Sequence, residues 1–201
     1  MQTGKLCLSF ACAGILLVTG CASFEVRPTA KAITLPQASK PIPVSVGITQ
    51  VDQKPTGGFP DLVQGLKHAL DESHLFQTVY YPMREEDKFD GGLHLQFGSR
   101  LSEDPALFPK AFLTGFFIFL PAPIVTYNHK YEADCVVDLI RGDKKLKTYI
   151  AKGNVSASHK LFASPSKLES EATEAAAKAL YVDLIQQLDR DREFIANELR
   201  R

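Results

Sequence analysis

Cysteine is scarce in this chain of 201 residues, and it is unevenly placed. Three of the four cysteines, Cys7, Cys12 and Cys21, lie within the first 21 residues. Beyond them only Cys135 remains, so residues 22–201 cannot form a disulfide among themselves. Their fold must therefore rest on a hydrophobic core, for which the length is sufficient in a single domain.

An excess of charge of either sign is also missing, because 23 basic residues balance 23 acidic ones. Nothing in this balance steers the chain toward nucleic acid. Catalytic and cofactor motifs are missing as well: there is no H-E-x-x-H, G-x-S-x-G, C-x-x-C or P-loop pattern. We therefore predict no catalytic residues, no metal and no cofactor, and hence a protein that is not an enzyme.

The N-terminus has the features of a secretion signal. Lys5 precedes an apolar run over residues 6–18, which is shorter than the about 20 residues of a membrane-spanning helix. The run ends in the letters VTGC, and this ending resembles the lipobox of bacterial lipoproteins. The resemblance implies cleavage after Gly20, attachment of a diacylglycerol to Cys21, and often a further acyl chain such as palmitate on the new amine.

Two or three acyl chains would hold the protein at a bilayer, since each buried CH₂ contributes roughly 0.8 kcal/mol. In lipoproteins of this kind, an Asp directly after the Cys tends to retain the protein at the inner membrane. Ala22 and Ser23 stand there instead. The resemblance thus implies a lipid-anchored protein on the periplasmic face of the outer membrane.

The segment after the lipobox differs in composition from the rest of the chain. Residues 21–43 comprise Cys21 and a stretch with four prolines among small and polar residues. Proline fixes φ and removes a hydrogen-bond donor, so this stretch is predicted to be an extended tether that holds the domain off the bilayer. Residues 44–201 are predicted to form one periplasmic domain.

Apolar periodicity in residues 44–201 predicts five strands and two helices. A period of two marks the strands, and a period of 3.6 marks the helices. The strands are expected at residues 44–52, 75–82, 92–101, 130–140 and 146–158, and the helices at residues 60–73 and 168–195. The order β-α-β-β-β-β-α predicts an α/β (α+β) fold: a two-layer sandwich in which a mixed sheet of about five strands carries two helices on one face.

This layout resembles small periplasmic domains of outer-membrane assembly proteins. It is similar to the outer-membrane lipoprotein of lipopolysaccharide assembly, to the N-terminal domain of TolB, and to the periplasmic part of the curli secretion lipoprotein. The resemblance covers residues 44–190 and concerns the order of elements, without a shared motif. It implies a role in envelope assembly or export.

One segment, "KAFLTGFFIFLPAPIVTYNHK" at residues 110–130, contains 17 consecutive uncharged residues, 111–127. Pro121, Pro123 and the short length exclude a membrane-spanning helix. We interpret residues 110–128 as an apolar insertion that is either a buried strand, a loop that dips into the membrane, or a loop that docks on a protein. For both loop hypotheses the predicted contact residues are Phe112, Phe116, Phe117 and Phe119.

The histidines are scattered, with none at i, i+4 spacing, and are interpreted as surface residues. Only His94 and His129 stand on neighbouring predicted strands, where they could approach each other as a metal pair. Cys135 lies on the apolar face of its strand and is interpreted as a small buried hydrophobe.

Three carboxylates share the other face of the strand that carries Cys135. Glu132, Asp134 and Asp138 could suggest a cation site, but we interpret them as a solvated face opposed by lysines of the next strand. The letters RGD at residues 141–143 are interpreted as a hairpin turn.

These observations predict a lipid-anchored envelope protein, a non-catalytic binding or scaffolding module in envelope assembly or export. Its predicted partners are the membrane, through the N-terminal acyl chains, and an envelope protein. Two alternatives remain: a subunit of an oligomeric outer-membrane secretion pore, and a metal-dependent or other hydrolase.

Overall fold

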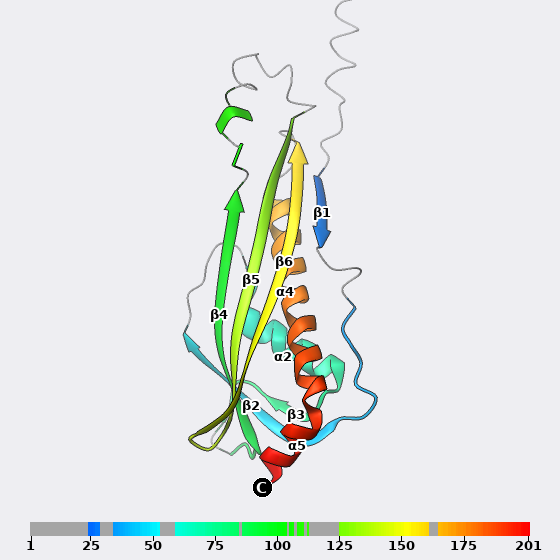
Figure 1. Ribbon diagram of the computed structural model, residues 1–201, viewed down its shortest axis with the longest axis vertical. Helices are drawn as coiled ribbons and strands as arrows, with labels where there is room; N and C mark the ends of the chain where they lie inside the picture. Colours follow the sequence, from blue (N-terminus) through cyan, green and yellow to red (C-terminus); the bar gives the residue numbers. More distant parts are fainter. Residues whose placement is uncertain are drawn as a thin grey trace, which may run out of the picture.

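A computed structural model describes residues 24–28, 34–52, 59–84, 86–103, 105–106, 108–110, 112, 125–160 and 165–201. Within them, a sheet is packed against helices (Figure 1). The strands are β1 (Phe24–Pro28), β2 (Ile42–Asp52), β3 (Phe76–Tyr80), β4 (Gly91–Glu103), β5 (Thr126–Arg141) and β6 (Lys144–Lys160). The helices are α2 (Leu62–Ser73), α4 (Pro165–Arg190) and α5 (Arg192–Arg200). In this part of the chain, no helix is long and apolar enough to cross a membrane.

The predicted fold class is confirmed. The sheet order is β1-β6-β5-β4-β2-β3; β2 runs parallel to β3 and to β4, and the other neighbours are antiparallel. The sheet is therefore mixed and open. From β2 onward the elements follow the predicted order, and β1 and α5 are additions to it.

The core lies between one face of the sheet and the helices. The predicted inward face of β5 is confirmed, since every second residue from Tyr131 to Leu139 is buried. Leu66, Leu70 and Leu184 bury their side chains against that same face, so α2 and α4 lie on one side of the sheet. Each fully buried Leu or Val contributes about 1.5–3 kcal/mol, so this single layer of contacts is the main stabilising term.

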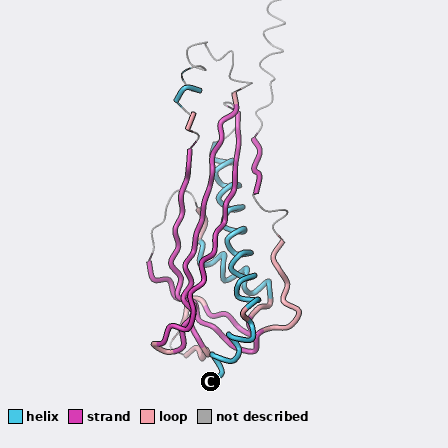
Figure 2. The backbone as a smooth tube through the Cα atoms, viewed as in Figure 1, coloured by secondary structure: helices cyan, strands magenta, loops and turns pink. Residues whose placement is uncertain are grey.

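The long β5–β6 hairpin gives the molecule its elongated shape (Figure 2). Its register runs from Arg141 opposite Lys144 to Thr126 opposite Lys160. Gly142 begins the two-residue turn with φ of 55°, a conformation that glycine adopts without steric cost. The interpretation of the RGD letters as a hairpin turn is confirmed.

The Pro-rich segment departs from its prediction. Where it is described, it is extended but bound to the domain: β1 pairs with β6, and the Ala38 N–H donates to the Ser73 carbonyl oxygen at 2.9 Å. An open sheet edge accepts Pro28, because proline is tolerated on edge strands. The extended conformation agrees with the prediction, whereas the hydrogen bonds that hold β1 and residues 34–41 to β6 and to the end of α2 were not predicted.

The predicted long C-terminal helix is interrupted at Asp191. The helix α4 ends at Arg190, and α5 begins at Arg192. Lys147 of β6 donates to the Asp191 carboxylate, which ties the junction between the helices to the sheet. This junction turns α5 toward β2, where its Ile195 and Leu199 are buried.

The two layers approach each other closely at Gly153 of β6. A Cβ atom at this position would overlap the backbone carbonyl of Ala176 in α4. Ala172, Ala176 and Ala177 are also buried, so the alanine-rich stretch brings the helix backbone close to the strand. The layers can approach this closely only because Gly153 has no side chain.

We expect Gly153→Ala to lower the free energy of unfolding by about 1–3 kcal/mol, because the added methyl group overpacks a backbone contact that cannot rotate away. Urea unfolding measures this change. The matched control is Gly98→Ala in β4, where the added Cβ would meet only the Asp134 carboxylate, at 2.7 Å. That side chain can move, so the control should change stability by less than about 0.5 kcal/mol. Equal effects of the two substitutions would contradict the role given to Gly153.

Candidate functional site

Four segments that are distant in the sequence meet at one end of the sheet, which we call the tip (Figure 1). They are the end of β4 with the residues after it, and the ends of β5, β6 and β1. The register joins them: Glu103 lies opposite His129, Thr126 opposite Lys160, and Phe24 opposite His159. The described residues of the tip are Phe24, Glu103, 105–106, 108–110, Phe112, 125–131 and 155–160.

Two aromatic side chains at the tip are exposed to solvent. Phe108 is 81% exposed and Phe112 is 63% exposed, the two largest values among the exposed large apolar residues of the described chain. The Lys110 ammonium donates to the Thr126 carbonyl oxygen at 2.8 Å and so ties this segment to the start of β5. The tip therefore combines an ordered connection with an apolar surface.

The inner face of the tip is aromatic. Tyr127 and His129 of β5 alternate with exposed residues, and His159 of β6 stands directly across from Tyr127. The His159 ring stacks on Tyr127 at 5.5 Å and on His129 at 5.0 Å, centroid to centroid. Across a hairpin, such direct and diagonal pairs stabilise the register.

The His159 imidazole lies in surroundings that disfavour a proton. The Nδ1 atoms of His129 and His159 are buried, and within the described residues neither has a hydrogen-bond partner. Burial, and after it the neighbouring His129, lower the pKa of His159. Both effects favour the neutral form of the His159 ring.

Of the predicted contact residues, only Phe112 can be placed, and it lies exposed on the tip. Phe116, Phe117 and Phe119 lie outside the described residues, as do Gly20 and Cys21. The three hypotheses for the apolar insertion thus remain predictions. Its expected end at residue 128 is corrected, because β5 begins at Thr126.

Sequence reasoning missed Phe108 and the stacked Tyr127, His129 and His159. A signal was present for Tyr127 and His129, which continue the two-residue period of Tyr131 and Ala133. For His159 no signal was available, because its ring contacts depend on the hairpin register. Phe108 is exposed owing to the chain path after β4, which periodicity does not indicate.

The structure does not bring His94 and His129 together as a possible metal pair. His94 lies opposite Asp138, whereas His129 lies opposite Glu103, nine residues further along β5. At about 3.3 Å per residue, the two histidines are about 30 Å apart along the sheet. The described residues hold no group of three or more His, Cys, Asp or Glu side chains that could bind a metal ion.

The acidic face of β5 is the solvated, ion-paired surface that the sequence predicted. Asp138 accepts from Thr148 and from Lys145, and these hydrogen bonds lower its carboxyl pKa, that of Thr148 most strongly. Glu132 pairs with Lys130, whose hydrogen bond lowers the Glu132 pKa. Two of the three carboxylates, Asp138 and Glu132, are thus ion-paired with lysines of the same hairpin.

Cys135 is fully buried on the opposite, inner face, as predicted. Burial, and after it the nearby Asp134 carboxylate, raise the pKa of its thiol to about 12. A thiol in that state is not a nucleophile near neutral pH. Cys135 therefore contributes to the packing of the core.

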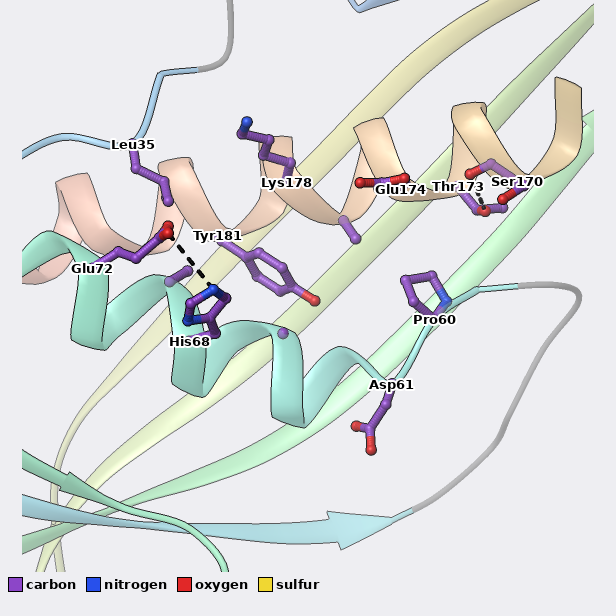
Figure 3. A pocket seen from close by; sticks show the side chains of 13 residues that line it. Leu35, Pro60, Asp61, His68, Glu72, Ser170, Thr173, Glu174, Lys178 and Tyr181 are labelled. Atoms are coloured by element: carbon purple, nitrogen blue, oxygen red, sulfur yellow. Dashed lines mark hydrogen bonds and ion pairs between the residues drawn. The ribbon is translucent and has the colours of Figure 1, made fainter. Parts of the chain in front are cut away.

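A cavity of about 500 Å³ lies between α2 and α4 (Figure 3). Asp61 caps α2 by accepting from the Val63 and Gln64 N–H groups, and the Tyr181 hydroxyl donates to the Leu62 carbonyl oxygen at 3.1 Å. Burial, followed by Asp61 and Cys135, raises the Tyr181 pKa. At the rim, His68 and Glu72 face each other at 3.6 Å on one side of α2. These polar groups are occupied by helix capping, backbone bonding and an ion pair, so we assign no chemistry to the cavity.

Comparisons with known proteins give a fold likeness only. No family model matches the chain, and no curated protein matches it. Similar solved structures include a minor lipoprotein from Acinetobacter baumannii, at 13% identity and a TM-score of 0.40, covering 77% of this chain and 94% of that one. A protein of the DUF330 family from Xanthomonas campestris is 12% identical with a TM-score of 0.45, and the match covers 84% and 97% of the two chains. The rare lipoprotein B from Shewanella oneidensis is 11% identical with a TM-score of 0.36, covering 78% and 99%. With TM-scores below 0.5, none of these likenesses bears on what the chain does.

The state of His159 predicts how stability depends on pH. Its pKa in the folded protein lies below the ordinary value of about 6.5, so the unfolded chain binds a proton first as the pH falls. The contribution of His159 is therefore complete above about pH 6.5 and decreases below it. Carboxylates whose pKa is lowered in the folded protein lose their contribution to stability only at lower pH, below about pH 5.

We expect the free energy of unfolding to decrease from pH 7.5 to pH 5.5, and this decrease to be smaller in His159→Phe, which keeps a stacked ring without a titrating nitrogen. Urea unfolding at the two pH values tests this. His68→Gln is the control, because that side chain is 74% exposed and outside the tip. A pH dependence in His159→Phe identical to that of the parent would contradict the prediction.

Proposed function

We propose that this protein is a lipid-anchored, non-catalytic binding module of the bacterial cell envelope. Cys21 carries the acyl chains, after cleavage behind Gly20, and the tip makes the contact with a membrane or an envelope partner. One observation supports the proposal most strongly. The strand β1 begins three residues after Cys21 and pairs with β6 at the tip, and Phe108 and Phe112 are exposed at the same tip. The anchor and the apolar surface would thus lie at the same end of the molecule.

A binding role suits the side chains of the domain better than a catalytic one. A hydrolase needs a nucleophile with a base, or a bound metal. Among the described residues, the histidines of the tip stack on aromatic rings, His68 pairs with Glu72, and Cys135 is buried with a raised pKa. Of the carboxylates that share a face, Glu132 is paired with a lysine, and Asp138 with a lysine and a threonine.

The mechanism would be recruitment. An anchored domain is confined to a thin layer at the membrane surface, which raises its effective concentration toward other membrane components. Contact through the tip then requires no high affinity of its own. The outer membrane is the proposed location, because Ala22 and Ser23, and not Asp, follow Cys21.

We expect lipid attachment to depend on Cys21 alone. Cells fed an alkyne-labelled fatty acid should give a labelled protein that begins at residue 21, as intact-mass measurement would show. Cys21→Ser should carry no label and keep residues 1–20, because the acceptor thiol is missing. The control Cys12→Ser changes a cysteine of the apolar run and should be labelled like the parent. A labelled Cys21→Ser protein would exclude the proposed anchor.

We expect a photo-crosslinking side chain at position 112 or 117 to form adducts with lipid or with another protein in intact cells. The same group in place of Leu95, which is fully buried, should react only within its own chain. Mass spectrometry of the adducts identifies the contact. Purely internal adducts from both position 112 and position 117 would remove the binding surface from the proposal.

A further inference from the structure

We infer that the tip faces the bilayer directly, so that the molecule stands upright on the membrane with Phe108 and Phe112 in the lipid interface. This inference rests on the proposed lipidation of Cys21 and names the partner of the tip: a lipid surface. The inference specifies both the contact between the tip and lipid and the orientation of the whole domain on the membrane.

The reach of the anchor limits where the bilayer can be. Phe24 is the third residue after Cys21, and an extended chain spans at most about 3.6 Å per residue, or about 11 Å in all. The backbone of Phe24 is held opposite His159 of β6. A lipid attached to Cys21 therefore places the membrane surface within about 11 Å of this end of the sheet.

So short a distance leaves no room for a folded protein between the tip and the membrane. A single helix with its side chains is about 10–12 Å wide, and a domain is wider. The exposed Phe108 and Phe112 would thus meet lipid before they could meet a globular partner. Phe112 and Val125 also flank the uncharged sequence 113–124, so both of its attachment points are at the tip.

The charge of the other surfaces favours the upright orientation over one in which the domain lies on its side. The outer face of the hairpin carries Lys130, Glu132, Asp134, Asp138 and Lys152, which would lose hydration against hydrocarbon. At the tip, the two imidazoles lack a hydrogen-bonded Nδ1 within the described residues, and the pKa of His159 is lowered. A neutral His159 ring tolerates the low dielectric of the interface better than ion pairs do.

The far end of the molecule then lies well away from the membrane. The strand β5 has 16 residues, and at about 3.3 Å each it separates the tip from the β5–β6 turn by about 50 Å. The helix α5 lies near that turn (Figure 1). An envelope partner would therefore meet the distal end or the flanks of the domain, and not the tip.

Single tryptophans report this orientation, because the natural chain contains no Trp. We would prepare Phe108→Trp, Phe112→Trp and the distal control Phe194→Trp, which is 39% exposed on α5. Each lipidated protein is inserted into vesicles of phosphatidylethanolamine and phosphatidylglycerol, with or without bromine on the acyl chains. We expect the emission of the two tip probes to shift to shorter wavelength and to be quenched by the brominated lipid, with no change for Phe194→Trp.

The intact mass of each preparation separates the two levels of the proposal. If the acyl chains are missing, the proposed anchor fails, and the orientation fails with it. If the acyl chains are present but neither tip probe is quenched, the anchor stands and the orientation is overturned. Quenching of Phe194→Trp to the same degree would mean that the domain lies flat, and tip probes shielded by a co-purifying protein would identify a protein contact; either result overturns the inference. Unfolding midpoints equal to the parent's confirm that each variant is folded.

Discussion

The contact between Gly153 and the Ala176 carbonyl sets the distance between the two layers, and the other contacts of the domain follow from that distance. At this spacing alanines are sufficient to fill the space between α4 and β6, as the burial of Ala172, Ala176 and Ala177 shows. Larger buried side chains of α4, among them Leu180, Leu184 and Leu188, extend the core beyond these alanines. Since α4 follows β6 in sequence and packs along it, one close contact aligns a 26-residue helix with a 17-residue strand.

This alignment explains why the tip is ordered although it lies far from the main core. The first turns of α4 bring Leu168 and Ala172 against Tyr131 and Val155, which form a second apolar cluster next to the tip. Beyond that cluster, packing passes from aliphatic contacts to the stacked rings of His129 and His159. The tip is therefore supported from inside the sheet, and its exposed aromatic residues do not have to hold it together.

Sequence periodicity was a good guide wherever a residue's environment depends on its own strand or helix. The inward face of β5, the hairpin turn at Gly142 and the solvated carboxylates of β5 were all predicted, because each depends on local alternation or turn chemistry. The errors concern relations between distant segments. Residues 24–28 have the composition of a tether, and only the open edge of β6 makes them a strand. His94 and His129 stand on neighbouring strands, but their separation depends on a register that no local pattern specifies.

The pairing of β1 has a consequence for the height of the domain above a membrane. Without this pairing, the chain from Cys21 to Ile42 would be a linker of 21 residues, long enough to span about 70 Å. Pairing of Phe24–Pro28 with β6 reduces the free part at the anchor to three residues. Pro28, one of the prolines that suggested a spacer, is compatible with this edge strand, because a proline on the open side of a sheet loses no ladder hydrogen bond. If Cys21 is lipidated as proposed, a five-residue edge strand decides whether the domain is held at the membrane surface or moves freely above it, and pulling on the anchor would load the β1–β6 ladder before any other part of the fold.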